Sequence, residues 1–140
     1  MICNAHLDPI WQWDWQEGAS AALSTFRSAV KLAEEFDYIF CHNEVTLYKY
    51  VEEYAPELFE KIRELVKKGK WHIMGGWYLQ PDSNMPSGES FVRQALVGKQ
   101  YFTQKFGVYP TTAINFDPFG HTRGAFPTTG FLGESKYQSY

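Results

Sequence analysis

Two short segments of the chain each contain an aspartate that is followed directly by proline. The first holds His6, Asp8 and Pro9, and the second, more than a hundred residues later, holds Asp117 and Pro118. Each Asp-Pro pair follows a short apolar run typical of a buried strand, and proline cannot continue the hydrogen-bonded ladder of a sheet. We therefore expect both aspartates at the carboxyl ends of strands, where α/β sheets and barrels gather their ligands.

These residue types predict a metal site. His6 and Asp8 are two apart, so their side chains share one face of an extended segment. Together with Asp117 they offer one nitrogen and two carboxylates, a set that suits Zn²⁺, Mn²⁺ or Co²⁺ better than Ca²⁺. Three protein ligands leave coordination positions for a substrate. The alternative is a structural histidine at a strand end. His121, four residues after Asp117, is a candidate substrate contact or partner of a ligand.

Clustered aromatic residues give a second chemical signal. Trp11, Trp13 and Trp15 lie within five residues, and Trp77 begins a long loop that ends near Gly88. Such clusters form either part of the core or a platform for a sugar, because a pyranose ring packs its C–H face on a flat aromatic ring.

Other polar residues near strand ends have simpler interpretations. His72 alternates with apolar residues and is expected to be partly buried in a strand, whereas His42 is ambiguous. Four further residues are expected to be caps or solvated charges: Glu44, Asp82, Glu89 and Arg93.

Strands and helices must alternate to position these groups. Strands are predicted at residues 2–5, 38–41, 71–74 (ended by Gly75 and Gly76) and 112–116, and residues 137–140 resemble a further strand. Helices are predicted after a loop at 12–18 and a cap at Ser20, over 45–54, from Pro56 to a stop at Gly69, and over 89–106 between Ser87 and Gly107. This alternation predicts right-handed βα units and a parallel sheet.

Composition narrows the class of protein. The 140 residues suit about one domain, and a net charge of −3 without a basic stripe argues against a nucleic-acid partner. No apolar run approaches the length of a membrane span. Cys3 and Cys41 lie in no metal or disulfide spacing, so we expect reduced thiols and a cytoplasmic location.

Three motifs together resemble glycoside hydrolase family 38, the α-mannosidases. They are residues 6–13, residues 75–77 with 81–90, and residues 117–121, and they occur in the family's order over about 120 residues. The resemblance implies the N-terminal part of a seven-stranded parallel α/β barrel, with about four βα units in residues 1–140. It also implies a retaining, zinc-dependent α-mannosidase of the bacterial, cytoplasmic type that acts on mannose-containing oligosaccharides.

The resemblance further assigns roles to individual residues. His6, Asp8 and Asp117 would be zinc ligands, and Asp117 would also be the nucleophile. Trp11 matches the aromatic residue under the sugar. Three more residues of the matched motifs are expected as substrate contacts: Trp77, Asp82 and His121.

Two functional groups of the family have no counterpart in this sequence. Its fourth zinc ligand, a histidine, and its acid/base aspartate lie further along the chain, and residues 125–136 do not resemble the helix expected there. We therefore expect an N-terminal fragment that is inactive alone. The unpaired edge of its sheet would favour self-association, so a homo-oligomer is compatible with the sequence.

Two other functions fit parts of the pattern. A metal-dependent carbohydrate deacetylase would use the same ligands to activate water against an acetyl group. A non-catalytic carbohydrate-binding fragment would use the aromatic residues alone.

Overall fold

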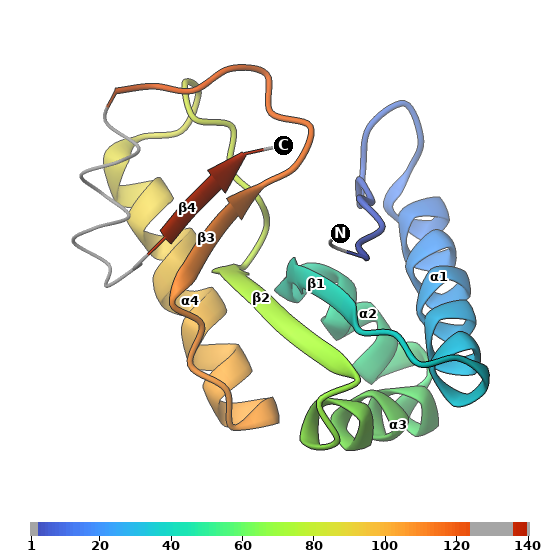
Figure 1. Ribbon diagram of the computed structural model, residues 1–140. Coiled ribbons are helices and arrows are strands. Elements are labelled where there is room, and N and C mark those ends of the chain that lie inside the picture. The colour runs from blue at the N-terminus through green and yellow to red at the C-terminus, as the bar shows by residue number, and fades with distance from the viewer. Residues whose placement is uncertain (1–2, 124–135, 140) are drawn as a thin grey trace. The chain divides into compact units, whose positions relative to one another are not determined.

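The strands in the described residues form two two-stranded sheets. The computed structural model describes residues 3–123 and 136–139 (Figure 1). Strands β1 (Phe40–Glu44) and β2 (Trp71–Trp77) pair in one sheet, and β3 (Thr112–Asn115) pairs with β4 (Lys136–Ser139) in the other. The described residues form two compact units, one of residues 3–42 and 46–72 and the other of residues 43–45 and those from 73 onward.

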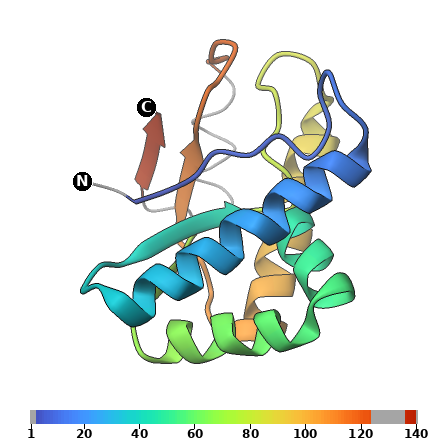
Figure 2. The same ribbon diagram turned by 90° about the vertical axis from the view of Figure 1, so that its right-hand side faces the viewer.

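The first unit packs helices around an aromatic cluster. It contains α1 (Trp15–Glu35), α3 (Pro56–Lys67) and most of α2 (Val45–Tyr54), and α1 lies against α3 (Figure 2). The ring of Phe26 is 5.0 to 5.2 Å from those of His42, Tyr48 and Trp71. Such edge-on aromatic contacts add to the apolar area that each ring buries.

Helix α1 begins earlier than its sequence pattern predicts. It starts at Trp15 after Asp14, so the expected loop at 12–18 and the cap at Ser20 are wrong. Gly18 lies within the first turns of the helix, where a Cβ would lie 2.0 Å from the Pro9 carbonyl oxygen. The missing side chain lets the preceding loop press against the first turn of the helix.

The first and third predicted strands also differ from the structure. The start of the chain makes one parallel bridge, between Cys3 and Phe40, rather than a described strand. Strand β2 continues through Gly75 and Gly76, and Gly75 adopts a positive φ of 75°. His72 is exposed, so its expected partial burial is wrong.

The second unit holds α4 (Gly88–Phe106) and a small core of Trp77, Phe91, Ala95 and Ala113. Both predicted ends of α4 are confirmed: the Ser87 hydroxyl accepts a hydrogen bond from the Ser90 backbone N–H, and Gly107 closes the helix with φ 68°. Strands β3 and β4 are parallel, with Thr112 opposite Lys136 and Asn115 opposite Ser139. The predicted parallel pairing is thus confirmed for this sheet, and the seven-stranded barrel stays an expectation.

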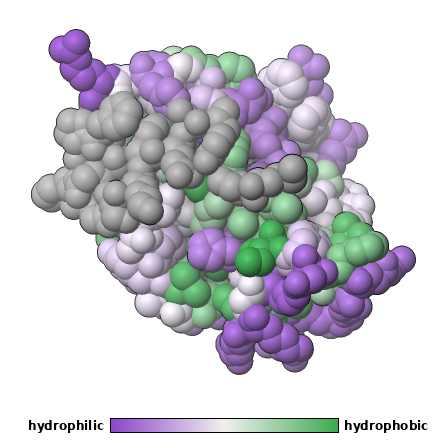
Figure 3. All heavy atoms as spheres, in the orientation of Figure 1, coloured by the Kyte–Doolittle hydropathy of each residue, from purple (hydrophilic) through white to green (hydrophobic). Residues whose placement is uncertain are grey.

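The surface retains several large apolar side chains. Ile10, Trp11 and Phe119 are more than half exposed. In Figure 3, apolar residues lie exposed between charged and polar ones on the face shown. None of the helices in residues 3–123 is both long and apolar enough to cross a membrane.

Candidate functional site

The side chains of His6 and Asp8 lie side by side on an irregular segment of the first unit. His6 Nε2 is 3.4 Å from Asp8 Oδ1, and the two side chains are 28% and 40% exposed. The segment is anchored before this pair by Asn4, whose Nδ2 donates to the Cys41 carbonyl oxygen over 2.8 Å. The predicted juxtaposition of the histidine and the first aspartate is therefore confirmed.

The chain after Asp8 is held by aromatic and glycine contacts. Trp13 Nε1 donates a hydrogen bond of 3.2 Å to the Asp8 carbonyl oxygen. Pro9 is buried where it meets Gly18. Together these contacts fix the backbone on which the Asp8 carboxylate is mounted and leave the carboxylate itself accessible.

A pocket opens beside this segment. It has a volume of about 590 Å³ and is lined by the loop from Ile10 to Asp14 and by the first turn of α1. Trp11 is 63% exposed, and its ring meets Trp13 edge-on at 5.7 Å between centroids. Amide and carboxylate groups of Gln12, Asp14 and Gln16 share the lining. An exposed indole ring flanked by polar groups can pack on the C–H face of a sugar ring.

Asp117 occupies an unusual backbone conformation in the second unit. It is exposed, and its φ of 47° makes it the non-glycine residue with positive φ within the described ranges. Such left-handed conformations are uncommon for residues other than glycine and cluster at functional sites. The turn lies two residues past the end of β3, near the strand end predicted from the sequence.

The geometry of His6 and Asp8 fits a zinc ion. Two donor atoms about 2.0–2.1 Å from a tetrahedral Zn²⁺ lie roughly 3.3 Å from each other, close to the observed 3.4 Å. Asp117 belongs to the second unit, whereas His6 and Asp8 belong to the first. In the described part of the chain, no three His, Cys, Asp or Glu side chains form a cluster that could hold a metal ion.

The three other predicted substrate contacts have different surroundings. Trp77 is 1% exposed, donates from Nε1 to the Ile114 carbonyl oxygen at 2.8 Å and packs on Phe91. A ring buried in this way offers no face to a sugar, so Trp77 is a core residue here. Asp82 accepts hydrogen bonds from the backbone N–H groups of Asn84 and Met85, which confirms it as a cap of its turn. His121 is exposed.

The polar residues at the end of β1 are buried. His42, Asn43 and Glu44 are at most 3% exposed, so the interpretation of Glu44 as a solvated charge is wrong. Burial lowers the pKa of His42 to about 3, and His42 therefore lies in the core as a neutral side chain. The exposed ion pair of Glu89 with Arg93 does confirm the expectation for those two residues.

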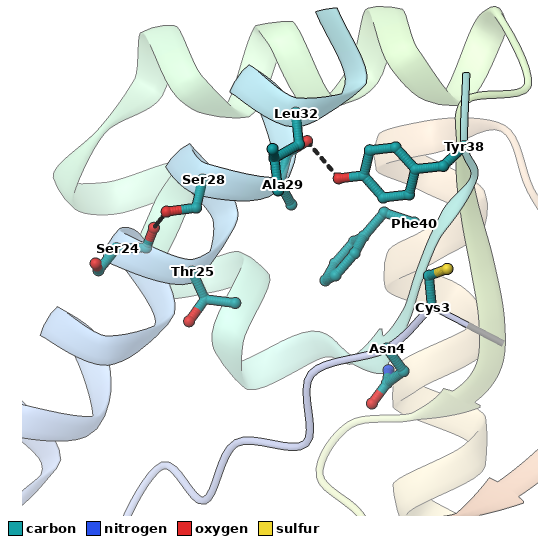
Figure 4. A pocket seen from close by; sticks show the side chains of 9 residues that line it. All are labelled: Cys3, Asn4, Ser24, Thr25, Ser28, Ala29, Leu32, Tyr38 and Phe40. Atoms are coloured by element: carbon teal, nitrogen blue, oxygen red, sulfur yellow. Dashed lines mark hydrogen bonds between the residues drawn. The ribbon is translucent and has the colours of Figure 1, made fainter. Parts of the chain in front are cut away.

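A second cavity in the first unit lies away from the predicted chemistry. It has a volume of about 370 Å³ and lies between α1 and the start of β1 (Figure 4). The Tyr38 hydroxyl donates to the Ala29 carbonyl oxygen over 2.7 Å beside it. Cys3 lines the cavity, and both Cys3 and Cys41 are free thiols. No predicted ligand or nucleophile is among its lining residues.

Gln80, which the sequence pattern did not single out, bonds the residue before Asp117. The side chain of Gln80 hydrogen-bonds both the N–H and the carbonyl oxygen of Phe116, and the Gln80 N–H donates to Glu44 Oε1. These partners are 36 residues apart and leave no periodic trace in the sequence. The available signal was the proline-rich loop from 77 to 88, which is longer than most connections in compact domains.

The chain is similar in sequence to several alpha-mannosidases. The chain is 31% identical over 122 residues to alpha-mannosidase G of Dictyostelium discoideum, covering 86% of this chain and 11% of that protein. It is 31% identical over 120 residues to mouse alpha-mannosidase 2C1, covering 85% of this chain and 12% of the relative. The chain thus spans about a tenth of the length of these relatives.

The fold is also similar to that of a solved alpha-mannosidase structure. An alpha-mannosidase from Enterococcus faecalis V583 superposes with a TM-score of 0.85 at 21% identity, covering 99% of this chain and 16% of the other. The model of the "Glycosyl hydrolases family 38 N-terminal domain" matches residues 1–128. With its histidine-aspartate pair and its left-handed Asp117, the chain belongs to glycosyl hydrolase family 38.

Proposed function

We propose that this chain carries part of the active site of a retaining, zinc-dependent α-mannosidase that removes terminal α-mannosyl residues from glycans. The observation that carries this proposal is the His6–Asp8 pair, 3.4 Å apart, on the same short segment as the exposed Trp11 and its pocket. A pair of candidate metal ligands a few residues before an exposed tryptophan suits a glycosidase. Membership of the family favours this chemistry over a deacetylase.

Asp117 is the proposed nucleophile. In a retaining glycosidase a carboxylate attacks the anomeric carbon, the bond to the leaving oxygen breaks, and a covalent glycosyl-enzyme forms that water then hydrolyses. The second carboxyl group, which protonates the leaving oxygen, is expected outside these 140 residues. The exposed position of Asp117 and its left-handed backbone support its presentation to a substrate.

His6, Asp8 and Asp117 are the proposed zinc ligands. When bound, zinc would supply an electrophilic contact for the hydroxyl groups of the sugar and would favour the ionised form of a neighbouring carboxylate. Trp11 would support the flat face of the mannosyl ring. A cytoplasmic location is part of the proposal, and the free thiols of Cys3 and Cys41 support it.

The proposal is tested on the complete protein with an aryl α-mannoside as substrate. We expect α-mannose as the first product in proton NMR spectra, and we expect Asp117→Asn to lower kcat by at least about 10⁴-fold, as removal of a nucleophile does in other hydrolases. Glu89→Gln is the control, because it changes an exposed carboxylate of the same unit. First formation of β-mannose would contradict retention, and full turnover by Asp117→Asn would remove the nucleophile assignment.

A further inference from the structure

We propose that Gln80 is a positioning residue for Asp117: its side-chain amide holds the peptide group that sets the left-handed backbone of the nucleophile. This inference rests on the nucleophile role proposed above. The carrying observation is a pair of hydrogen bonds between one side chain and one backbone residue. Gln80 Nε2 donates to the Phe116 carbonyl oxygen over 2.5 Å, and the Phe116 N–H donates to Gln80 Oε1 over 2.8 Å.

The Gln80 side-chain amide bonds the backbone directly after the end of β3. Strand β3 ends at Asn115, which pairs with Ser139 of β4. Phe116 is the next residue, and its N–H and its carbonyl oxygen both bond the Gln80 side chain. The Gln80 side chain supplies one acceptor and one donor, as the backbone of an adjacent strand would.

The bond to the Phe116 carbonyl oxygen acts directly on Asp117. That oxygen belongs to the peptide group that joins Phe116 to Asp117, and this group is planar. Holding its plane fixes one side of the rotation about the Asp117 N–Cα bond, which is the φ angle. A φ of 47° persists in a non-glycine residue only when its surroundings impose it.

Gln80 is itself held in place. Its backbone N–H donates to Oε1 of the buried Glu44 over 3.0 Å. Two residues earlier, the Tyr78 N–H donates to the Gln94 carbonyl oxygen, a backbone group of α4. Gln80 is thus held by a buried carboxylate at a strand end and by the backbone of α4, which a positioning group requires.

The test compares Gln80→Met with Gln94→Met in the complete protein. Both substitutions remove a side-chain amide that bonds a backbone group in the same unit, but only Gln80 bonds Phe116. We expect Gln80→Met to lower kcat about 100-fold with KM within about threefold, because small displacements of a reacting group cost about that much. Gln94→Met should leave kcat within about threefold.

A second variant and a readout independent of turnover complete the test. Gln80→Glu keeps the size of the side chain and the acceptor for the Phe116 N–H, but loses the donor to the Phe116 carbonyl oxygen. It should therefore lose kcat much as Gln80→Met does. In both Gln80 variants the Asp117 Cα chemical shift should move, and in Gln94→Met it should stay.

Each outcome is decisive. Equal losses in Gln80→Met and Gln94→Met would mean that the loop only stabilises the unit, which overturns the inference. Near-normal kcat in both Gln80 variants, with Asp117→Asn inactive, would overturn the inference and leave the proposed function intact. If Asp117→Asn were active, the proposed function would fail, and the Asp117 chemical shift would still decide whether Gln80 holds this turn.

Discussion

The two Asp-Pro segments use different means to present similar carboxylates. Asp8 lies on a segment whose geometry places it beside His6, and Trp13 holds its backbone carbonyl. Asp117 lies in a left-handed turn, and Gln80 holds the peptide group before it. In the first segment neighbouring residues place the carboxylate, whereas in the second a residue 36 positions away holds the residue before it.

This difference matches the different roles proposed for Asp8 and Asp117. Asp8 is proposed only as a metal ligand, whereas Asp117 is proposed as both a metal ligand and the nucleophile. A nucleophile must in addition be aligned with the reacting carbon of the substrate. We therefore expect changes behind Asp117 to affect turnover and changes behind Asp8 to affect metal affinity.

The largest effects are expected from adding a methyl group at two glycines, Gly18 beside the Asp8 segment and Gly98 where α4 meets β2. A Cβ at Gly18 would lie 2.0 Å from the Pro9 carbonyl oxygen, and one at Gly98 would lie 1.9 Å from that of Gly76. Because both contacts are with backbone, each alanine should lower the free energy of unfolding by about 3 kcal/mol. Chemical denaturation measures this. Gly88→Ala, with nothing within 4 Å, is the control and should be neutral or slightly stabilising.

Removal of His6 tests the proposed metal ligands of the first segment. His6→Ala should weaken zinc binding about 100-fold or more, because a lost ligand costs at least as much as a lost partner of a ligand. Elemental analysis and titration of the purified chain measure this. The exposed His72 provides the control variant His72→Ala. Undiminished zinc binding by His6→Ala would exclude His6 as a ligand.

Acid should weaken the first unit through His42. Its pKa falls from 6.5 to about 3 on burial, so below pH 6.5 the unfolded chain binds a proton that the folded chain does not. Stability should therefore fall as the pH drops from 6.5 toward 3, by about 2 kcal/mol at pH 5. Urea unfolding at pH 7 and pH 5 measures the change. The fall should persist in His72→Gln and shrink in His42→Asn, and an unchanged fall in His42→Asn would assign it to another group.

The smallest expected effect concerns the backbone behind Asp8. Trp13→Phe removes the indole N–H that donates to the Asp8 carbonyl oxygen and keeps an aromatic ring against Trp11. Loss of one partly buried hydrogen bond should weaken zinc binding by about 1 kcal/mol, or roughly fivefold. Isothermal titration with zinc measures it. If Trp13→Phe lowered turnover more than Gln80→Met does, the expectation that changes behind Asp8 act mainly on metal affinity would be wrong.

Local signals predicted the helices of this chain well. The range of α2, the proline at the start of α3 and both caps of α4 follow from residues within one or two turns. The start of α1 and the length of β2 could not be predicted this way. Near them Gly18 meets Pro9 and Gly75 packs near Asn43 and Ile114, which are contacts that the local pattern does not reveal.

Some features of the candidate site also follow from local sequence, and others depend on distant contacts. The closeness of His6 and Asp8 follows from their spacing, and the exposure of Trp11 agrees with its expected role. The burial of Trp77 could not be read from its motif, because it depends on the Ile114 carbonyl group and the Phe91 ring. The contacts of Gln80 and Glu44 likewise appear only once the strand ends are brought together.

The division of β1 between the two units restricts how this chain can be dissected. Residues 43–45 belong to the second unit, although the first unit continues on both sides of them. An expression boundary placed before Ile73 would therefore give a polypeptide without Glu44, the acceptor for the Gln80 N–H. During synthesis on the ribosome, the second unit likewise draws on residues made about thirty positions before its main part. The residues of the two units therefore alternate along the sequence.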